Sequence, residues 1–463
     1  MAATLMVRVL VGLGGYAGEH RPPIYSDFEA QRHWMELTTH LPLRAWYRYR
    51  SDWWPLDYPP LSGFHAYILG RIGHAIHPAW MALRQSEGFE SPGLRFFMRS
   101  TAIVTECTLL IPAMWAWTGC RFLSASPSPS PSRDRTQRLT AFAYLAAFPL
   151  LTLVDHGHFQ YNAAMFGFAL WALVFWHRGA YVRGAIAFVC ALSFKQIALY
   201  YAIPVFCHLL TECSAIARRG APWRALLTLA SLGAAVIATF GLAVMPFVAA
   251  ATIVGTILRR VFPVSRGLLE GLTANLWCVV DVVMKLQRDY TTDQLLRLST
   301  AVTAAAVVPW NAVYLTVPAA KYTSFLYLLA ISALGFFLCS YLVHEKGIML
   351  TALPLLMLMP VEPTAAAWFQ LVAMWTNYFM LRDDGQALPY AALGLGWMAV
   401  AAPMMPWRHP HALVRRLGMA SIGTMVALHV AQLTIPPPQR YVLLYPLLFA
   451  GVGALQFALF YLY

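Results

Sequence analysis

Charged residues are scarce in this chain. Lysine, arginine, aspartate and glutamate make up 11% of its 463 residues, whereas hydrophobic residues make up 59% and the mean hydropathy is +0.57. Soluble domains are about one quarter charged, and no polar stretch of this chain is as long as such a domain. The composition therefore excludes an ordinary soluble protein. It predicts an all-α polytopic membrane protein with a single membrane-embedded domain over residues 1–463.

The sequence also lacks the patterns of a disulfide framework, a metal site and a nucleic-acid surface. Its seven cysteines lie mostly in or at the ends of apolar segments, and no two have the CxxC spacing. Buried cysteines of this kind behave as small hydrophobic residues. The net charge of +13 is spread over short loops instead of forming a basic face with interleaved aromatic residues. We therefore expect no nucleic acid as a partner, and membrane lipid around the protein.

Apolar segments recur along the whole chain, and we interpret fourteen of them as membrane spans. A span needs about 20 apolar residues to cross a hydrocarbon core of about 30 Å. The first segment is short, because thirteen residues form a helix of only about 20 Å, so it is either truncated or continues through Gly15. Residues 61–76 are interrupted by polar residues and glycines, which suits a helix in the membrane interface. The remaining spans are expected near residues 101–122, 139–154, 163–177, 184–197, 198–213, 225–248, 298–317, 322–342, 347–361, 364–381, 388–405, 416–434 and 441–460.

Basic residues cluster in the short loops at alternate ends of these spans. The positive-inside rule assigns these loops to the cytosol. The same rule assigns the Ser/Pro-rich segment 123–138 to the cytosol, where its composition predicts a disordered linker. The opposite, lumenal side receives every polar motif of interest: a long first loop at 17–98, a second long region at 250–297, and the short segments 155–162, 195–196, 344–346 and 382–385.

The densest polar cluster lies at residues 25–38, within the first long loop. Asp27 and Glu29 are separated by one residue, so they share a face of an extended segment but point about 200° apart on a helix. Either carboxylate could act as a general base toward a hydroxyl group, and the pair could bind a divalent cation. Because this spacing is common by chance, a functional role for the cluster is supported only by its position at the end of a span.

Four other polar motifs suit a sugar or a phosphate. Residues 52–60 combine carboxylates, aromatic rings and prolines, which could form a rigid platform under a sugar ring or an interfacial aromatic belt. The stretch 155–162 carries histidine and amide side chains that could bind hydroxyls or phosphate more readily than a metal, because helical ligand spacing is missing. Lys195 and the tripeptide 344–346 place ammonium groups near the membrane boundary, where each needs an anionic partner, either a phosphate or an acidic side chain.

Several stretches together carry a resemblance to a known family. They are SDFEAQRHWMELTTHLP, LDYPPLSGFHAYILG, GFESP, FMRST, DHGHFQYN, FKQIALYY, RVFPVSRG, ANLWCV and VHEK, which run in this order from about residue 10 to 346. In these stretches the chain resembles the dolichyl-phosphate-glucose-dependent α-1,3-glucosyltransferases of the endoplasmic reticulum. The motifs DFEAQRHWME and FESP resemble those of the first of the two glucosyltransferases, which acts on the nine-mannose acceptor.

The resemblance implies a GT-C fold with the catalytic site in the first lumenal loop. It also implies an inverting transfer, without metal or other cofactor, from dolichyl phosphate glucose to a dolichyl-diphosphate-linked oligosaccharide, with Asp27 as the general base. Three features depart from the family pattern: the first span is short, Ser26 replaces a usual glycine, and Pro55 stands where glycine is common.

The remaining site residues follow from this mechanism. Inversion needs a base on one face of the sugar and charge stabilisation of the leaving phosphate on the other. For the phosphate we expect Lys195, Arg266, His344, Lys346 and Arg32. For the sugar and acceptor we expect Asp57, Tyr58, His156, His158, Gln160 and Trp277, with Glu29 as a supporting carboxylate. The alternatives are the second glucosyltransferase, a mannosyltransferase of the same fold, a polytopic transporter, and a non-catalytic membrane chaperone.

Overall fold

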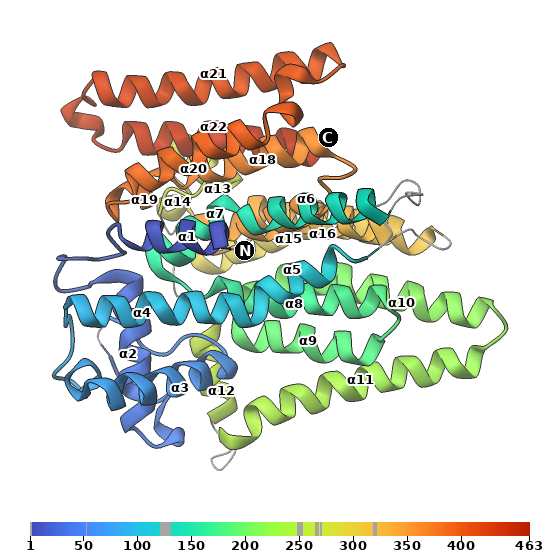
Figure 1. The fold of residues 1–463 in the computed structure, drawn as a ribbon, viewed down its shortest axis with the longest axis horizontal. Coiled ribbons are helices and arrows are strands. Elements are labelled where there is room, and N and C mark those ends of the chain that lie inside the picture. Colours follow the sequence, from blue (N-terminus) through green and yellow to red (C-terminus); the bar gives the residue numbers. More distant parts are fainter. Residues whose placement is uncertain are drawn as a thin grey trace.

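The described part of the protein is built from helices, without a β-strand. The computed structural model describes residues 2–51, 53–120, 131–247, 253–263, 268, 271–317 and 322–463. Most of the long helices run side by side, while α2 and α3 lie together at one end of them (left in Figure 1). The α-helices are α1 (Ala2–Gly12), α2 (Ser26–His40), α3 (Pro60–Ile76), α4 (Pro92–Thr105), α5 (Ile111–Trp117), α6 (Pro131–Ala147), α7 (Pro149–Thr152), α8 (Asn162–His177), α9 (Tyr181–Phe194), α10 (Ala202–Arg218), α11 (Pro222–Val244), α12 (Ile253–Val261), α13 (Leu276–Met284), α14 (Leu286–Asp289), α15 (Thr292–Thr316), α16 (Tyr322–Cys339), α17 (Met349–Met357), α18 (Pro363–Thr376), α19 (Tyr378–Asp383), α20 (Ala387–Val400), α21 (Ala412–Thr434) and α22 (Leu444–Leu462).

Seven helical segments among the described residues are long and apolar enough to cross a membrane. α6 and the segment Pro149–Phe159 form a further pair that is bent by 45° at the break between them. α1, α8, α9 and α20 are apolar but shorter, with 10–17 residues each. The protein is therefore a polytopic membrane protein. The seven segments are Pro92–Trp117, Gln196–Arg218, Pro222–Phe247, Thr292–Thr316, Tyr322–Cys339, Ala412–Thr434 and Leu444–Leu462.

Prolines mark the beginnings of several helices. α3, α4, α11 and α18 each have proline at the first or second position, where the missing N–H would have no partner within the helix. α4 is capped as well, because the side chain of Ser91 accepts a hydrogen bond from the backbone N–H of Leu94 at 3.1 Å. These local signals fix where the helices begin. α11 and α18 begin within three residues of the expected spans at 225 and 364, whereas α4 begins nine residues before the span expected at 101.

The segment between α1 and α4 carries the polar cluster at residues 25–38 and packs tightly. α3 lies against α2 through small residues, since a Cβ atom at Gly70 would stand 2.4 Å from the carbonyl oxygen of Met35. This close approach holds α2, with Asp27 in its first turn, across the end of the long helices. A large side chain at position 70 would separate the two helices.

One prediction about the linker is wrong in part. Residues 131–138 belong to α6 instead of a disordered segment, because proline suits the first helical position and the residues that follow continue into an apolar helix. The rest of the predicted linker, residues 123–130, lies outside the described residues.

Candidate active site

A cavity of about 620 Å³ opens at the end of the helices where α2 begins. Ligand pockets in proteins commonly have volumes of about 300–1,000 Å³. The cavity brings together eight of the residues expected from the sequence, although they come from five separate parts of the chain. These residues are Asp27, Asp57, Tyr58, His158, Gln160, Lys195, His344 and Lys346.

Asp27 is the point on which the polar groups of this cavity converge. His158 Nε2 lies 2.6 Å from Asp27 Oδ2, Gln160 Nε2 donates to the same oxygen at 2.7 Å, and Lys346 Nζ donates to it as well. Among the described residues, every hydrogen bond to the Asp27 side chain falls on Oδ2. Oδ1 therefore has no protein donor there, and the side chain, which is 22% exposed, can accept a proton from a bound hydroxyl group.

His158 connects Asp27 to a second carboxylate. Its Nδ1 lies 2.6 Å from Asp384 Oδ2, in the turn after α19, while its Nε2 faces Asp27. A carboxylate at one ring nitrogen fixes the orientation of an imidazole and the proton on that nitrogen. Since an ionised carboxylate can only accept, the buried ring donates to Asp27 as well as to Asp384 when both of its nitrogens carry a proton.

Gln160 and Asn162 link Asp27 to Lys195. Gln160 Oε1 accepts hydrogen bonds from Lys195 Nζ at 2.9 Å and from Tyr58 at 3.3 Å, and Asn162 Oδ1 accepts from Lys195 Nζ at 2.6 Å. Asn162 Nδ2 in turn donates to Asp155 at 2.7 Å. Lys195 is thus held by two neutral acceptors, and its charge remains available to an anionic ligand at the cavity wall.

Unusual backbone conformations place Asp27 and Gln160. Tyr25 and Ser26, directly before Asp27, have φ angles of 54° and 47°, and Phe159, directly before Gln160, has a φ of 90°. Left-handed conformations are costly for residues other than glycine and concentrate at functional sites. Gly18 makes the turn at Tyr25 possible, because a Cβ atom at this glycine would stand 2.1 Å from the Tyr25 carbonyl group.

The charges of this cavity act on the pKa of Asp27. Burial alone would raise that pKa, but the charge of Lys346 and the hydrogen bond from His158 outweigh it and hold the Asp27 pKa well below its usual range. Burial would lower the pKa of Lys346, whereas the charge of Asp27 raises it above its ordinary value. Asp27 and Lys346 therefore form an ion pair at neutral pH when no ligand is bound.

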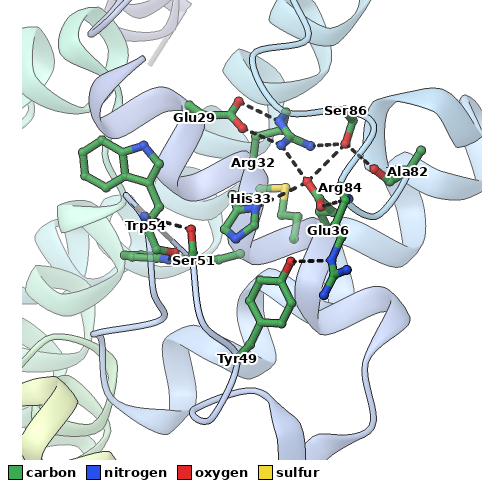
Figure 2. A network of polar contacts seen from close by, with 12 residues as sticks. Glu29, Arg32, His33, Glu36, Tyr49, Ser51, Trp54, Ala82, Arg84 and Ser86 are labelled. Carbon is green, nitrogen blue, oxygen red and sulfur yellow. Dashed lines mark hydrogen bonds and ion pairs between the residues drawn. The ribbon is translucent and has the colours of Figure 1, made fainter. Parts of the chain in front are cut away.

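Two residues expected in the site, Glu29 and Arg32, lie elsewhere. Because residues 26–40 form a helix, Glu29 points away from Asp27 and pairs with Arg32 at 2.5 Å. Arg32 also contacts Glu36 at 2.7 Å and Ser86 at 2.6 Å, and its side chain has no exposed surface. Figure 2 shows Arg32 between the two glutamates, facing the loop that carries Ser86. This network fastens α2 to the 78–91 loop instead of facing the cavity.

The other expected residues are also placed away from the cavity or lie outside the description. His156 contacts Glu106 at 2.7 Å on the opposite side of the 155–160 stretch. Trp277 is buried in a separate hydrophobic cluster and donates its indole N–H to the carbonyl group of Cys339 at 2.8 Å. Arg266 lies outside the described residues.

Sequence reasoning did not single out Asp384 and Glu345, which also line the cavity, and it considered Asn162 only as one of the amide side chains of residues 155–162. Asn162 and Asp384 lie in polar segments that were assigned to the same membrane face, and Glu345 lies within the tripeptide 344–346. Their positions in apolar surroundings are the signal that could have selected them. The pairing of Asp384 with His158 could not have been read in this way, because 226 residues separate the two.

The fold and the cavity define a polytopic helical membrane protein with a carboxylate and lysine site at one end of its helices. The chain belongs to the ALG6, ALG8 glycosyltransferase family, whose model matches residues 4–463. It is 35% identical to the dolichyl pyrophosphate Man9GlcNAc2 alpha-1,3-glucosyltransferase of Gallus gallus, over 99% of this chain and 94% of that protein. Proteins of the same name from Saccharomyces cerevisiae and Mus musculus are 35% and 33% identical, over 99% of this chain and 89% and 94% of theirs.

Proposed function

We propose that this protein transfers the first glucose from dolichyl β-D-glucosyl phosphate to the nine-mannose, dolichyl-diphosphate-linked oligosaccharide in an α-1,3 linkage. The names of the relatives support the acceptor and the linkage. The observation that carries the proposal is the position of Asp27, which shares one cavity with Lys195, His344 and Lys346. A base and a group of cations are what a single displacement at a sugar phosphate needs.

The proposed reaction is one inverting step. The 3-hydroxyl oxygen of the terminal mannose attacks the anomeric carbon, and its proton goes to Asp27. The bond between the anomeric carbon and the phosphate oxygen breaks, and dolichyl phosphate leaves with the electron pair. Its added negative charge is stabilised by Lys195, Lys346 and His344 through charge-assisted hydrogen bonds. A covalent glucosyl-enzyme would retain the configuration and is not part of the proposal.

The ion pair between Asp27 and Lys346 implies that the donor binds before Asp27 acts as the base. While Lys346 contacts Asp27, the carboxylate is a weak base. A donor phosphate offers Lys346 a second anion, so donor binding is expected to draw the ammonium group away and make Asp27 more basic. Asp57, Tyr58, His158 and Gln160 are then in place for the sugar hydroxyls, and Arg266 remains a predicted phosphate contact.

We further propose a GT-C architecture of about fourteen spans in the membrane of the endoplasmic reticulum, with the cavity on the lumenal side. Residues 17–98 would form the first lumenal, catalytic loop and residues 250–297 the second long lumenal region. The family assignment and the apolar helices support this arrangement. The cavity contains residues from both of these regions.

The test uses purified protein, synthetic donor and two defined acceptors, which carry nine mannoses with either no glucose or one glucose. We expect a mass increase of one hexose on the acceptor without glucose. Asp27→Asn keeps the shape of the side chain but removes its basicity, and should lower the rate about 10²–10⁴-fold. Asp293→Asn, an exposed position outside the cavity, is the matched control and should retain full activity.

Three outcomes would contradict the proposal. Transfer only to the acceptor that already carries one glucose would identify the second glucosyltransferase. Uptake of labelled substrate into proteoliposomes without any transfer would identify a transporter. Glucose transfer by Asp27→Asn at the wild-type rate would show that Asp27 is not the general base.

A further inference from the structure

A second cavity, of about 690 Å³, lies between α1 and α4. These two helices run side by side near the end where α2 packs (Figure 1). The cavity is separated from the Asp27 cavity by the 155–160 stretch, because His156 lines the second cavity whereas His158 lines the first. The proposed transfer reaction uses none of the residues of the second cavity.

Arg99 is the unusual group in this lining. It is 6% exposed, and its NH2 atom donates to the carbonyl oxygens of Gly15 at 2.9 Å and Gly157 at 2.8 Å. Its Nε and NH1 atoms have no hydrogen-bond partner among the described residues. A buried charged group with unsatisfied donors is costly, so the site is suited to a ligand that supplies anionic oxygen atoms.

The neighbouring charges are already paired. Arg8 contacts Glu106 at 2.5 Å, Arg95 contacts Glu19 at 3.2 Å, and His20 contacts Glu90 at 2.5 Å. No ion pair of Arg99 is found in the described part of the chain. Arg99 is therefore the one arginine of this lining without an ion pair among the described residues, and a single guanidinium group suits an anion with a single negative charge better than a diphosphate.

The walls on either side of Arg99 are apolar and open to the surroundings. Leu13 at the end of α1 is 70% exposed, and Phe96 on α4 is 76% exposed. Both residues line the cavity, and α4 belongs to the membrane-spanning segment Pro92–Trp117. A hydrocarbon chain along these side chains would cover apolar surface next to the buried guanidinium group.

We propose that this cavity binds one membrane glycerophospholipid, with its phosphodiester at Arg99 and an acyl chain along Leu13 and Phe96. His156 adds a polar contact, because its Nδ1 atom also lacks a partner and lines the same cavity. With Nε2 directed at Glu106, Nδ1 can accept a hydrogen bond from a headgroup hydroxyl. The single charge and the apolar walls together favour a phospholipid over free phosphate.

The lipid site adjoins the wall of the catalytic cavity. Arg99 holds the carbonyl oxygens of Gly15 and Gly157, and the backbone N–H of Ala17 donates to the carbonyl oxygen of His158 at 3.0 Å. A phosphate at Nε and NH1 of Arg99 would fix that side chain and, through the carbonyl group of Gly157, the backbone next to His158. Bound phospholipid is therefore expected to raise the thermal stability of the protein.

Native mass spectrometry of the delipidated, purified full chain tests this proposal. The probe is phosphatidylglycerol, and diacylglycerol with the same chains, inorganic phosphate and dolichyl diphosphate are the comparison ligands. We expect one phosphatidylglycerol molecule to be retained and to raise the unfolding temperature. Arg99→Gln should weaken that binding about tenfold or more, the loss expected for a charged hydrogen bond.

A second pair of variants separates binding from folding. Ser100→Phe fills the cavity from α4 without touching the Arg99 hydrogen bonds, and should weaken binding as strongly as Arg99→Gln. Val104→Phe, one turn further along α4 and outside the cavity, should bind the lipid like the wild type. Unchanged binding in Ser100→Phe would overturn the proposal, as would equal retention of diacylglycerol or inorganic phosphate. Displacement of phosphatidylglycerol by a lower concentration of dolichyl diphosphate would assign the site to the acceptor lipid instead.

Discussion

Asp384 Oδ2 lies 2.6 Å from Nδ1 of His158, although 226 residues separate the two in the sequence. The opposite nitrogen of the ring, Nε2, lies 2.6 Å from Asp27. Asp384 therefore has the position of a residue that orients His158 toward the proposed base, as carboxylates do behind many functional histidines. Among the described residues, His158 is the side chain that hydrogen bonds to both Asp384 and Asp27.

The first prediction concerns this orientation. Asp384→Asn removes a charged hydrogen bond worth about 1.5–3 kcal/mol, so kcat should fall about 10-fold to 100-fold in the glucose-transfer assay. Because His158 also loses a nearby negative charge, the pH profile of kcat should change in shape. The exposed Asp289, paired with its neighbour Arg288, gives the control variant Asp289→Asn. A normal pH profile together with normal kcat in Asp384→Asn would show that the contact is only structural.

The second prediction concerns the ion pair of Lys346 with Asp27. Asp27 has a lowered pKa in the folded protein, so it remains ionised until the pH falls through that low value. Lys346→Gln removes the positive charge that lowers the pKa. The pKa should then rise by about one to three units, and the acidic limb of kcat/KM should move to higher pH by the same amount.

The measurement is kcat/KM against pH at low donor concentration for Lys346→Gln. Lys285→Gln, an exposed lysine outside the cavity, should leave the acidic limb in place. Lys346→Gln should also raise KM for the donor, because the ammonium group is a proposed phosphate contact. An acidic limb that does not move would mean that another group controls it.

The third prediction tests whether Arg32 stabilises the fold instead of binding the donor phosphate. Arg32 is buried between Glu29 and Glu36, and the pKa of Glu36 is affected in two directions: burial would raise it, but the hydrogen bond from His33 and the charge of Arg32 lower it to about 2. Arg32→Met leaves two buried carboxylates without their cation, which costs about 3–5 kcal/mol. The unfolding temperature should fall strongly, while KM for the donor in the folded fraction stays unchanged.

Thermal unfolding and donor titration of the same sample check this prediction. Arg44 is exposed and lies four residues after the end of α2. Arg44→Met is therefore the control and should leave the unfolding temperature unchanged. If Arg32→Met instead keeps its stability and raises KM for the donor, Arg32 contacts the phosphate after all.

The sequence alone could predict much of the site because charge is so rare in this chain. Asp27, Gln160, Lys195 and Lys346 are polar groups at the ends of apolar segments, and the structure brings all four into one cavity. The same reasoning selected Arg32, whose charge is used inside the fold. Its ion-pair partners Glu29 and Glu36 lie three and four residues away, a spacing that brings side chains together only on a helix, and no helix over residues 26–40 was predicted. The contact with Ser86 could not be predicted, because Ser86 lies 54 residues away and depends on the packing of the 78–91 loop on α2.

The helices, too, could be predicted from the sequence only in part. Long apolar runs such as α11 and α21 were predictable, since their ends are marked by proline or by basic loops. The bend of 45° between α6 and the segment Pro149–Phe159 falls at Phe148, directly before Pro149. Proline disfavours a helical residue before it, so the sequence marks the place of the break but not its angle. The number of spans remains a prediction for the short apolar helices, whose length alone does not decide whether they cross a membrane.

The last prediction concerns Ser26, the residue directly before Asp27. Its φ of 47° is left-handed, a conformation that costs a residue with a Cβ atom about 1–2 kcal/mol and glycine almost nothing. Ser26→Gly removes this cost, but it also stabilises the unfolded chain by about 0.5–1 kcal/mol through added conformational entropy. The unfolding temperature of Ser26→Gly should therefore equal or exceed that of the wild type, whereas Ser26→Val should lower it, because β-branched residues tolerate this conformation poorly.

The control, Ser231→Gly, makes the same change inside the exposed helix α11 and should be destabilising by about 0.5–1 kcal/mol. Thermal unfolding of the three variants decides the matter, since equal losses in Ser26→Gly and Ser231→Gly would show that the backbone at Ser26 stores no strain.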